Sequence, residues 1–178
     1  DLIRDRFGYH HVQVFLMDQQ DEYATLQAST GEAGRQLLAN SHQLAKGSQS
    51  VIGQVTEAGT PTIALDTADA NVVHQPNQFL PLTRSEMALP LFVKGRIVGA
   101  LDVQSNNPNA FSEEDVRALS TLSGQIAIAI DNANLYEEIE RRASDVSLLF
   151  DITVIATASN TLADALQTVT DKLYEAFN

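Results

Sequence analysis

The stretch that says most about the fold is residues 87–103, which read MALPLFV-KG-RIVGALDV. Two apolar, β-rich runs flank Lys94-Gly95, and the glycine can supply the positive φ that a two-residue hairpin turn requires. Apolar residues occupy both faces of each run. The sequence therefore predicts a hairpin that is covered on both faces.

The segments around this hairpin complete a mixed pattern of strands and helices. Upstream, β-rich runs over residues 11–17 and 23–29 are separated by turn formers and predict a second hairpin. Downstream, Ser112 with Asp115 three residues later predicts the capped start of a helix. Between the hairpins we expect helices over residues 35–40 and 50–58, a strand over 62–65 and a long irregular loop over 67–84.

The C-terminal part of the chain is helical in pattern, with no proline or glycine from Gln125 onward. A stripe at alternating spacings of four and three contains the apolar residues Leu135, Ile139, Val146 and Leu149, with Arg142 and Thr153 as imperfect positions. Ser159-Asn160-Thr161 breaks this stripe. A further amphipathic helix then follows, with apolar residues Leu162, Leu166, Val169, Leu173 and Phe177.

Composition excludes several classes of function. The net charge of -12, without a basic stripe or tail, argues against direct nucleic-acid binding. No apolar run is long enough to span a bilayer. The chain has no cysteine, so it has no disulfide, no cysteine-ligated metal and no thiol nucleophile. These features are compatible with a cytoplasmic location, which we expect.

The element order and several motifs resemble a GAF domain. The resemblance extends over residues 1–136 and rests on residues 84–91, 95–103, 110–115 and 119–132, with residues 47–55 similar to the family's middle helix. It implies an α+β fold with an antiparallel central sheet, helices on one face, a loop-covered pocket on the other, and a long C-terminal helical connector. We therefore expect a GAF-like sensor domain over residues 1–134, and a signalling helix with the start of a second GAF-like domain over residues 135–178.

The resemblance also implies a function. GAF domains precede output modules such as histidine kinases, cyclases and phosphodiesterases, and they bind a small molecule, a chromophore or one another. We expect a sensory domain of a bacterial tandem-GAF signalling protein, which relays ligand or partner state through its C-terminal helix to an output domain in the same polypeptide. A dedicated small-ligand or haem sensor and a pure dimerisation module are the alternatives.

The missing cysteines restrict the cofactor and the chemistry. Relatives that carry a bilin attach it through a cysteine thioether, and relatives that reduce free methionine sulfoxide also need cysteine, so neither chemistry is expected here. Haem bound through His74 is less favoured than an exposed loop histidine. No triad, metal cluster or phosphate loop is recognisable, so we expect neither an enzyme nor a metal site, and the sequence identifies no cofactor.

Candidate ligand-binding residues lie on the 87–103 hairpin and the loop before it. With a two-residue turn, Met87 lies opposite Asp102 and Ser85 lies opposite Gln104, so polar groups gather at one end of one strand face. They are interpreted either as a pocket floor or as strand-end residues that face water or the covering loop. In the loop, His74, Phe79 and Arg84 are further candidates, with Arg84 able to clamp an anion or to pair with Asp66 or Glu86.

The apolar stripe of the tail suggests an interface. We expect Leu135, Ile139, Val146 and Leu149 to pair with their copies in a homodimer, because an isolated helix of this kind is marginal in water. The alternative is that the last helix folds back onto the sheet.

Overall fold

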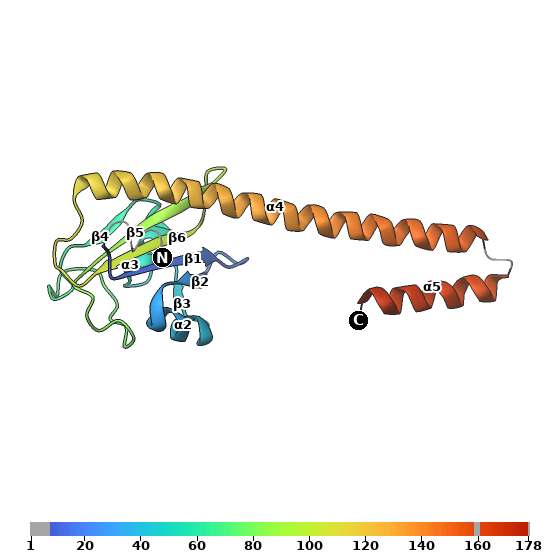
Figure 1. Ribbon diagram of the computed structural model, residues 1–178, viewed down its shortest axis with the longest axis horizontal. Helices are drawn as coiled ribbons and strands as arrows, with labels where there is room; N and C mark the ends of the chain where they lie inside the picture. The colour runs from blue at the N-terminus through green and yellow to red at the C-terminus, as the bar shows by residue number, and fades with distance from the viewer. Residues whose placement is uncertain (1–7, 159–160, 178) are drawn as a thin grey trace. The chain divides into compact units, whose positions relative to one another are not determined.

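The computed structural model describes residues 8–158 and 161–177 (Figure 1). The chain divides into two compact units, Asp1–Ala129 and Ile130–Asn178. The boundary falls within one long helix. The first unit contains the sheet and every candidate ligand-binding residue.

Six antiparallel strands form a single sheet in the order β3-β2-β1-β6-β5-β4. Both hairpins predicted from the sequence are confirmed, and β1 pairs with β6 at the centre of the sheet. The three-residue strand β3 was not predicted. The strands are β1 His11–Met17, β2 Tyr23–Ser29, β3 Gln43–Ala45, β4 Thr62–Ala64, β5 Ser85–Val93 and β6 Arg96–Ser105.

The register between β5 and β6 corrects the sequence prediction. Val93 pairs with Arg96 as expected, but a bulge between Leu91 and Phe92 shifts every later pair by one residue. Because strand side chains alternate between faces, a shift of one residue exchanges the two faces of the strand.

The shift separates residues that were expected to lie together. Met87 pairs with Val103 rather than Asp102, and Ser85 pairs with Ser105 rather than Gln104. Ser85 and Met87 therefore lie on the opposite face of the sheet from Asp102 and Gln104. The true neighbours of those two residues are Ala88, opposite Asp102, and Glu86, opposite Gln104.

Each face of the sheet has its own apolar layer. Met87, Leu89, Leu91, Leu101 and Val103 lie on one face, which the first part of the long helix α4 (Glu113–Ala158) crosses in Figure 1. The other face packs against helices α2 (Gly31–Ala39) and α3 (Val51–Ala58) through a cluster that contains Phe15, Ala24, Leu26, Leu37, Val51, Ile52, Val55 and Ala100. The α+β fold with an antiparallel sheet is confirmed, and α2 and α3 share their face with the loop between β4 and β5.

The helices α2 (Gly31–Ala39) and α3 (Val51–Ala58) flank the loop-covered face. The start of α3 is held by Ser50, whose Oγ accepts a hydrogen bond of 2.9 Å from the Gly53 backbone N–H. Its end is fixed by Gly59, which adopts φ 69° as the expected C-terminal stop. Helix α2 begins four residues earlier than the sequence predicted.

Helix α4 (Glu113–Ala158) begins with the predicted cap, in which Asp115 N–H donates to Ser112 Oγ and Ser112 N–H donates back to the Asp115 carboxylate. Helix α5 (Leu162–Phe177) has a matching cap between Thr161 and Asp164. In the unit Ile130–Asn178, Leu135, Ile139, Val146 and Leu149 are between 40% and 65% exposed. Of the α5 stripe, the side chains of Leu173 and Phe177 lie outside the described residues.

None of the helices in the described part of the chain is both long and apolar enough to cross a membrane.

Candidate functional site

A cavity of about 510 Å³ lies on the sheet face that α2, α3 and the β4–β5 loop cover. Strand residues form its floor, and loop residues 75–79 form part of its wall. Its volume suits a small metabolite. Its lining residues are Gln13, Phe15, Leu37, Asn40, His42, Leu44, Ser50, Ile52, Gln75, Pro76, Asn77, Gln78, Phe79, Glu86, Asp102 and Gln104.

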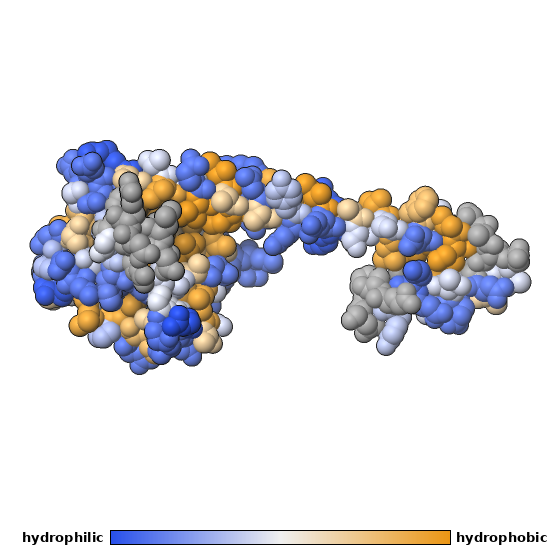
Figure 2. Space-filling view, in the orientation of Figure 1, coloured by the Kyte–Doolittle hydropathy of each residue, from blue (hydrophilic) through white to orange (hydrophobic). Residues whose placement is uncertain are grey.

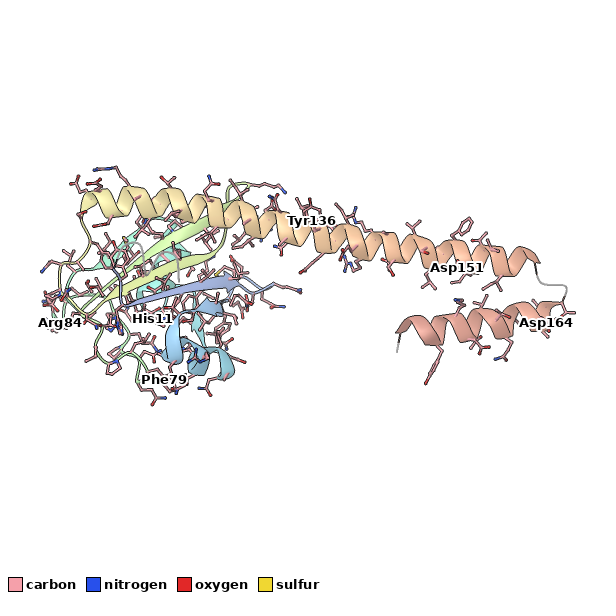
Figure 3. All side chains as sticks on the ribbon, viewed as in Figure 1. His11, Phe79, Arg84, Tyr136, Asp151 and Asp164 are labelled. Carbon is pink, nitrogen blue, oxygen red and sulfur yellow. The ribbon has the colours of Figure 1, made fainter. Side chains whose placement is uncertain are left out.

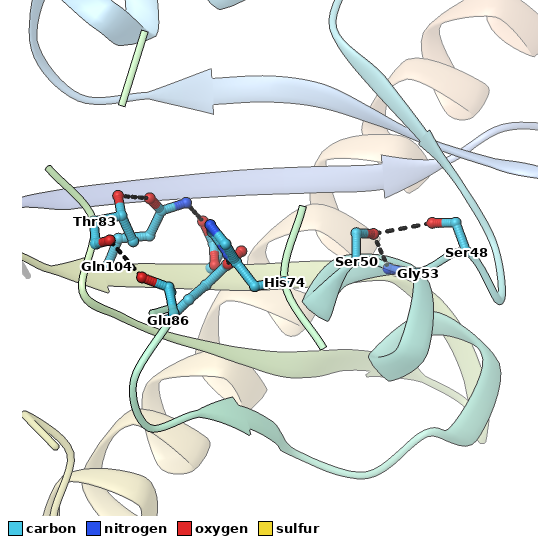
Figure 4. A network of polar contacts seen from close by, with 9 residues as sticks. Ser48, Ser50, Gly53, His74, Thr83, Glu86 and Gln104 are labelled. Carbon is cyan, nitrogen blue, oxygen red and sulfur yellow. Dashed lines mark hydrogen bonds and ion pairs between the residues drawn. The ribbon is translucent and has the colours of Figure 1, made fainter. Parts of the chain in front are cut away.

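The floor of the cavity contains a connected polar network (Figure 4). Thr83 Oγ1 donates to Gln104 Oε1 at 2.7 Å, and Gln104 Nε2 donates to Asp102 Oδ2 at 2.8 Å. The carboxyl groups of Asp102 and Glu86 lie close enough in this network that each affects the pKa of the other. His74 Nδ1 lies 2.5 Å from Glu86 Oε2 and connects the β4–β5 loop to this network.

Burial determines the charge of the network. It raises the pKa of the Glu86 carboxyl to about 7, and burial together with the neighbouring Glu86 raises the pKa of Asp102 well above its ordinary value. Burial lowers the pKa of His74. Since burial favours the neutral form of each group, we assign the His74–Glu86 contact as a hydrogen bond between a neutral imidazole and a neutral acid, not as an ion pair.

Two buried oxygen atoms in the cavity floor have no hydrogen-bond partner, Asp102 Oδ1 and Gln13 Oε1. Asp102 is 1% exposed and Gln13 is 3% exposed. The two residues face each other directly across the β1–β6 pair. A buried acceptor without a donor is costly, so this pair marks a position at which a bound molecule would be stabilised.

The structure brings together some of the residues predicted from the sequence. Phe79, Asp102 and Gln104 line the cavity, and His74 contacts it through Glu86. His74 is therefore largely buried, and the interpretation as an exposed loop histidine is wrong.

The remaining predicted residues lie elsewhere. The Arg84 guanidinium pairs with the Asp66 carboxylate at 3.0 Å on the surface, which is one of the two interpretations left open by the sequence. Figure 3 shows Arg84 at the end of the sheet and Phe79 beside α2. Ser85 is buried on the opposite face of the sheet, where its Oγ donates to the Asn107 carbonyl, and Met87 shares that face.

Sequence reasoning missed Glu86 and Gln13, the residues that with Asp102 define the floor. Glu86 is adjacent to two predicted residues and was excluded only by the assumption of an unbulged hairpin. Gln13 lies on β1, and its position opposite Asp102 results from the pairing of β1 with β6. Local sequence patterns do not predict this long-range pairing.

Comparison with known proteins supports the fold. Residues 1–131 match the family model of the GAF domain. GAF domain-containing protein A from Dictyostelium discoideum is 43% identical over 51 residues, which are 29% of this chain and 30% of that protein. The chain thus matches less than a third of the length of this relative.

Two similar solved structures represent two kinds of protein. The GAF domain of a phosphoenolpyruvate-protein phosphotransferase from Coxiella burnetii is 20% identical, with a TM-score of 0.65 over 76% of this chain and 80% of that one. The free methionine-R-sulfoxide reductase from Neisseria meningitidis, solved in complex with its substrate, is 29% identical, with a TM-score of 0.58 over 68% and 67%.

The reductase corrects one expectation from the sequence. We expected that the domain is not an enzyme, because no catalytic motif is recognisable. Enzymes with this fold are among the similar structures, so the fold is compatible with catalysis as well as with regulation. The family match over residues 1–131, the six-stranded sheet and the similar structures agree: this chain belongs to the GAF domain family.

Proposed function

We propose that this chain is a sensory domain of a signalling protein, and that its cavity binds a small polar metabolite. The observation that carries the proposal is the cavity itself, whose floor is polar, buried and connected through His74 to the covering loop. A ligand that displaces water from this floor would alter the His74–Glu86 contact and thereby the position of the loop. Such a change is the elementary event of a sensor.

One of the similar solved structures supports a ligand of amino-acid size. The Neisseria meningitidis reductase was solved with its substrate, and its name identifies that substrate as free methionine-R-sulfoxide. At 29% identity, this likeness makes free amino acids and their oxidised forms the first compounds to test. A ligand of this size fits within about 510 Å³.

The test is a binding titration of the full chain with free methionine sulfoxide and a panel of amino acids, followed by NMR. Binding in the cavity should shift the side-chain amide signals of Gln13 and Gln104. Phe79→Ala, which removes a wall residue, should weaken binding, whereas Glu113→Gln on the exposed start of α4 should not. A ligand whose affinity is the same in both variants would contradict a site in this cavity.

An enzymatic role is the second candidate, and a specific observation favours it. A carboxyl group with a pKa near 7 can donate or accept a proton at neutral pH, as a general acid or base must. The chain has no cysteine, so a reaction here would use these carboxyl groups and not a thiol. Product analysis of the same titration mixtures by mass spectrometry distinguishes turnover from simple binding.

We further propose that the helical segment relays the ligand state in a homodimer, within a bacterial tandem-GAF protein that carries an output domain. Apolar side chains recur along this segment (Figure 2), and the exposed Leu135, Ile139, Val146 and Leu149 keep the spacing of a helix that pairs with its own copy. Exposure of such side chains forfeits about 1.5–3 kcal/mol each.

Light scattering on the full chain and on one that ends at Tyr136 tests this relay proposal. We expect a dimer and a monomer, respectively. A monomeric full-length chain at high micromolar concentration would contradict the dimer and favour a tail that folds back on the sheet. A dimer that persists in the shortened chain would place the interface elsewhere.

A further inference from the structure

We infer that the part of the ligand that reaches the cavity floor is a compact organic cation with N–H donors, such as a primary ammonium group, held by Asp102 Oδ1 and Gln13 Oε1. This inference rests on the proposed ligand-binding role of the cavity and specifies the class of its ligand.

The first argument is the pair of unsatisfied acceptors. Asp102 Oδ1 and Gln13 Oε1 are buried, lack donors and line the same cavity. Their residues are direct partners across two neighbouring strands, so one donor group with two N–H bonds can reach both side chains. An ammonium group has three N–H donors and no acceptor, which matches the two acceptor oxygens that lack a partner in the cavity floor.

The second argument is the charge around the floor. The titratable groups that face it are Glu86 from β5, Asp102 from β6, His74 from the β4–β5 loop and His42 from the segment before β3. None of the described residues that line the cavity is a lysine or an arginine. Two buried carboxyl groups therefore have no cationic side chain to balance them, and burial favours their protonated forms in the empty protein.

A cationic ligand would compete with protonation of these two carboxyl groups. An ammonium group against Asp102 favours the ionised carboxylate, so binding should release a proton from the carboxyl pair into solution. Anionic ligands such as nucleotides and phosphates would be repelled by the same carboxyl groups when these are ionised. Within the part of the chain that the structure describes, no group of three or more histidine and acidic side chains is arranged to hold a metal ion, which argues against a metal as the occupant.

The affinity should consequently depend on pH. Below neutral pH the carboxyl pair keeps its proton and competes with the cation. As the pH rises through about 7, where Glu86 ionises, binding of an ammonium compound should strengthen. The histidines contribute little to this dependence, because burial lowers the pKa of both His74 and His42 and keeps them neutral.

Matched probe compounds test this inference. n-Butylammonium, n-butanol and butyrate have similar size and differ in charge, and each is titrated into the full chain at pH 6 and pH 8. We expect n-butylammonium alone to shift the Gln13 side-chain amide signals, with an affinity at least about tenfold higher at pH 8 than that of n-butanol. Calorimetry in two buffers of different ionisation enthalpy should show proton release on binding.

Two variants and a metal titration locate the contact. Asp102→Asn keeps the shape of the side chain and removes its charge, so it should reduce the n-butylammonium affinity at least about tenfold and abolish proton release. Gln13→Leu should weaken binding less and leave proton release in place. Calcium or zinc ions that alone shift the same Gln13 signals would overturn the inference.

The outcomes separate this inference from the proposed function. Butyrate or n-butanol bound in the cavity more tightly than n-butylammonium would overturn the cationic class and leave the cavity as a ligand site. If none of the probes and none of the amino-acid panel shifts the cavity signals, the proposed function fails, and the inference fails with it.

Discussion

Replacement of the buried carboxyl of Glu86 by an amide should stabilise this domain at alkaline pH. In Glu86→Gln, the amide Nε2 can donate to His74 Nδ1 and the amide oxygen can accept from Asp102, so the contacts of the neutral acid are kept. The change removes only the possibility of a buried negative charge.

The expected magnitude follows from the pKa of Glu86. Its folded-state value is about 7 against an ordinary value of 4.5, which corresponds to about 3 kcal/mol at about 1.4 kcal/mol per pKa unit. The folded state keeps the proton up to about pH 7, whereas the unfolded chain loses it near pH 4.5. The stability due to this group is thus fully present below pH 4.5 and is lost as the pH rises through about 7.

The assay compares wild type and Glu86→Gln at pH 5 and at pH 8.5, by urea unfolding of the full chain. Hydrogen exchange of β1 and β6 amides reports on the sheet separately from the helical tail. We subtract the free energy of unfolding of wild type from that of the variant at each pH. This difference should be larger at pH 8.5 than at pH 5, by up to about 3 kcal/mol. Glu113→Gln, on the exposed start of α4, is the control and should show no such change. An equal difference at both pH values would refute the argument that Glu86 is buried in its neutral form.

Other predictions concern positions around the site. Ser50→Ala removes the α3 cap and should reduce stability by about 1 kcal/mol in thermal unfolding; an unchanged melting temperature would argue against the cap. Gly59→Ala should also cost about 1 kcal/mol, because φ 69° disfavours a side chain and the added Cβ would lie 3.2 Å from Ile97 Cδ1. Arg84→Ala should leave ligand affinity unchanged and cost under about 1 kcal/mol of stability, since its pair with Asp66 is on the surface. A large loss of ligand affinity in Arg84→Ala would instead support the interpretation that Arg84 binds an anionic ligand.

The hairpin turn and the helix ends could be predicted from the sequence, because residues within a few positions specify them. The Lys94-Gly95 pair between two β-rich runs predicted the β5–β6 hairpin, and both residues adopt the positive φ of its turn. Ser112 and Gly59 marked a helix start and a helix end through the chemistry of capping. Such signals act within a few residues, so the sequence alone carries them.

The floor of the site could not be predicted in the same way. The bulge between Leu91 and Phe92 decides whether Glu86 or Met87 shares a sheet face with Asp102, and no local sequence pattern marks it. The approach of His74 to Glu86 depends on the path of a loop across 12 residues of sequence. Both features are products of tertiary structure, which strand and helix periodicity do not encode.

The most direct measurement of the central claim is a pH titration of the side-chain carboxyl ¹³C signals of Glu86 and Asp102 by NMR, with and without n-butylammonium. In the free protein, Glu86 should titrate near pH 7 and Asp102 should hold its proton well above pH 3.8. At saturation with n-butylammonium, the pKa of both carboxyl groups should fall, because the positive charge of the ligand favours the ionised carboxylates. Ordinary pKa values for both groups in the free protein, or values that the bound cation leaves unchanged, would contradict a buried carboxyl pair as the floor of a cation-binding sensor site.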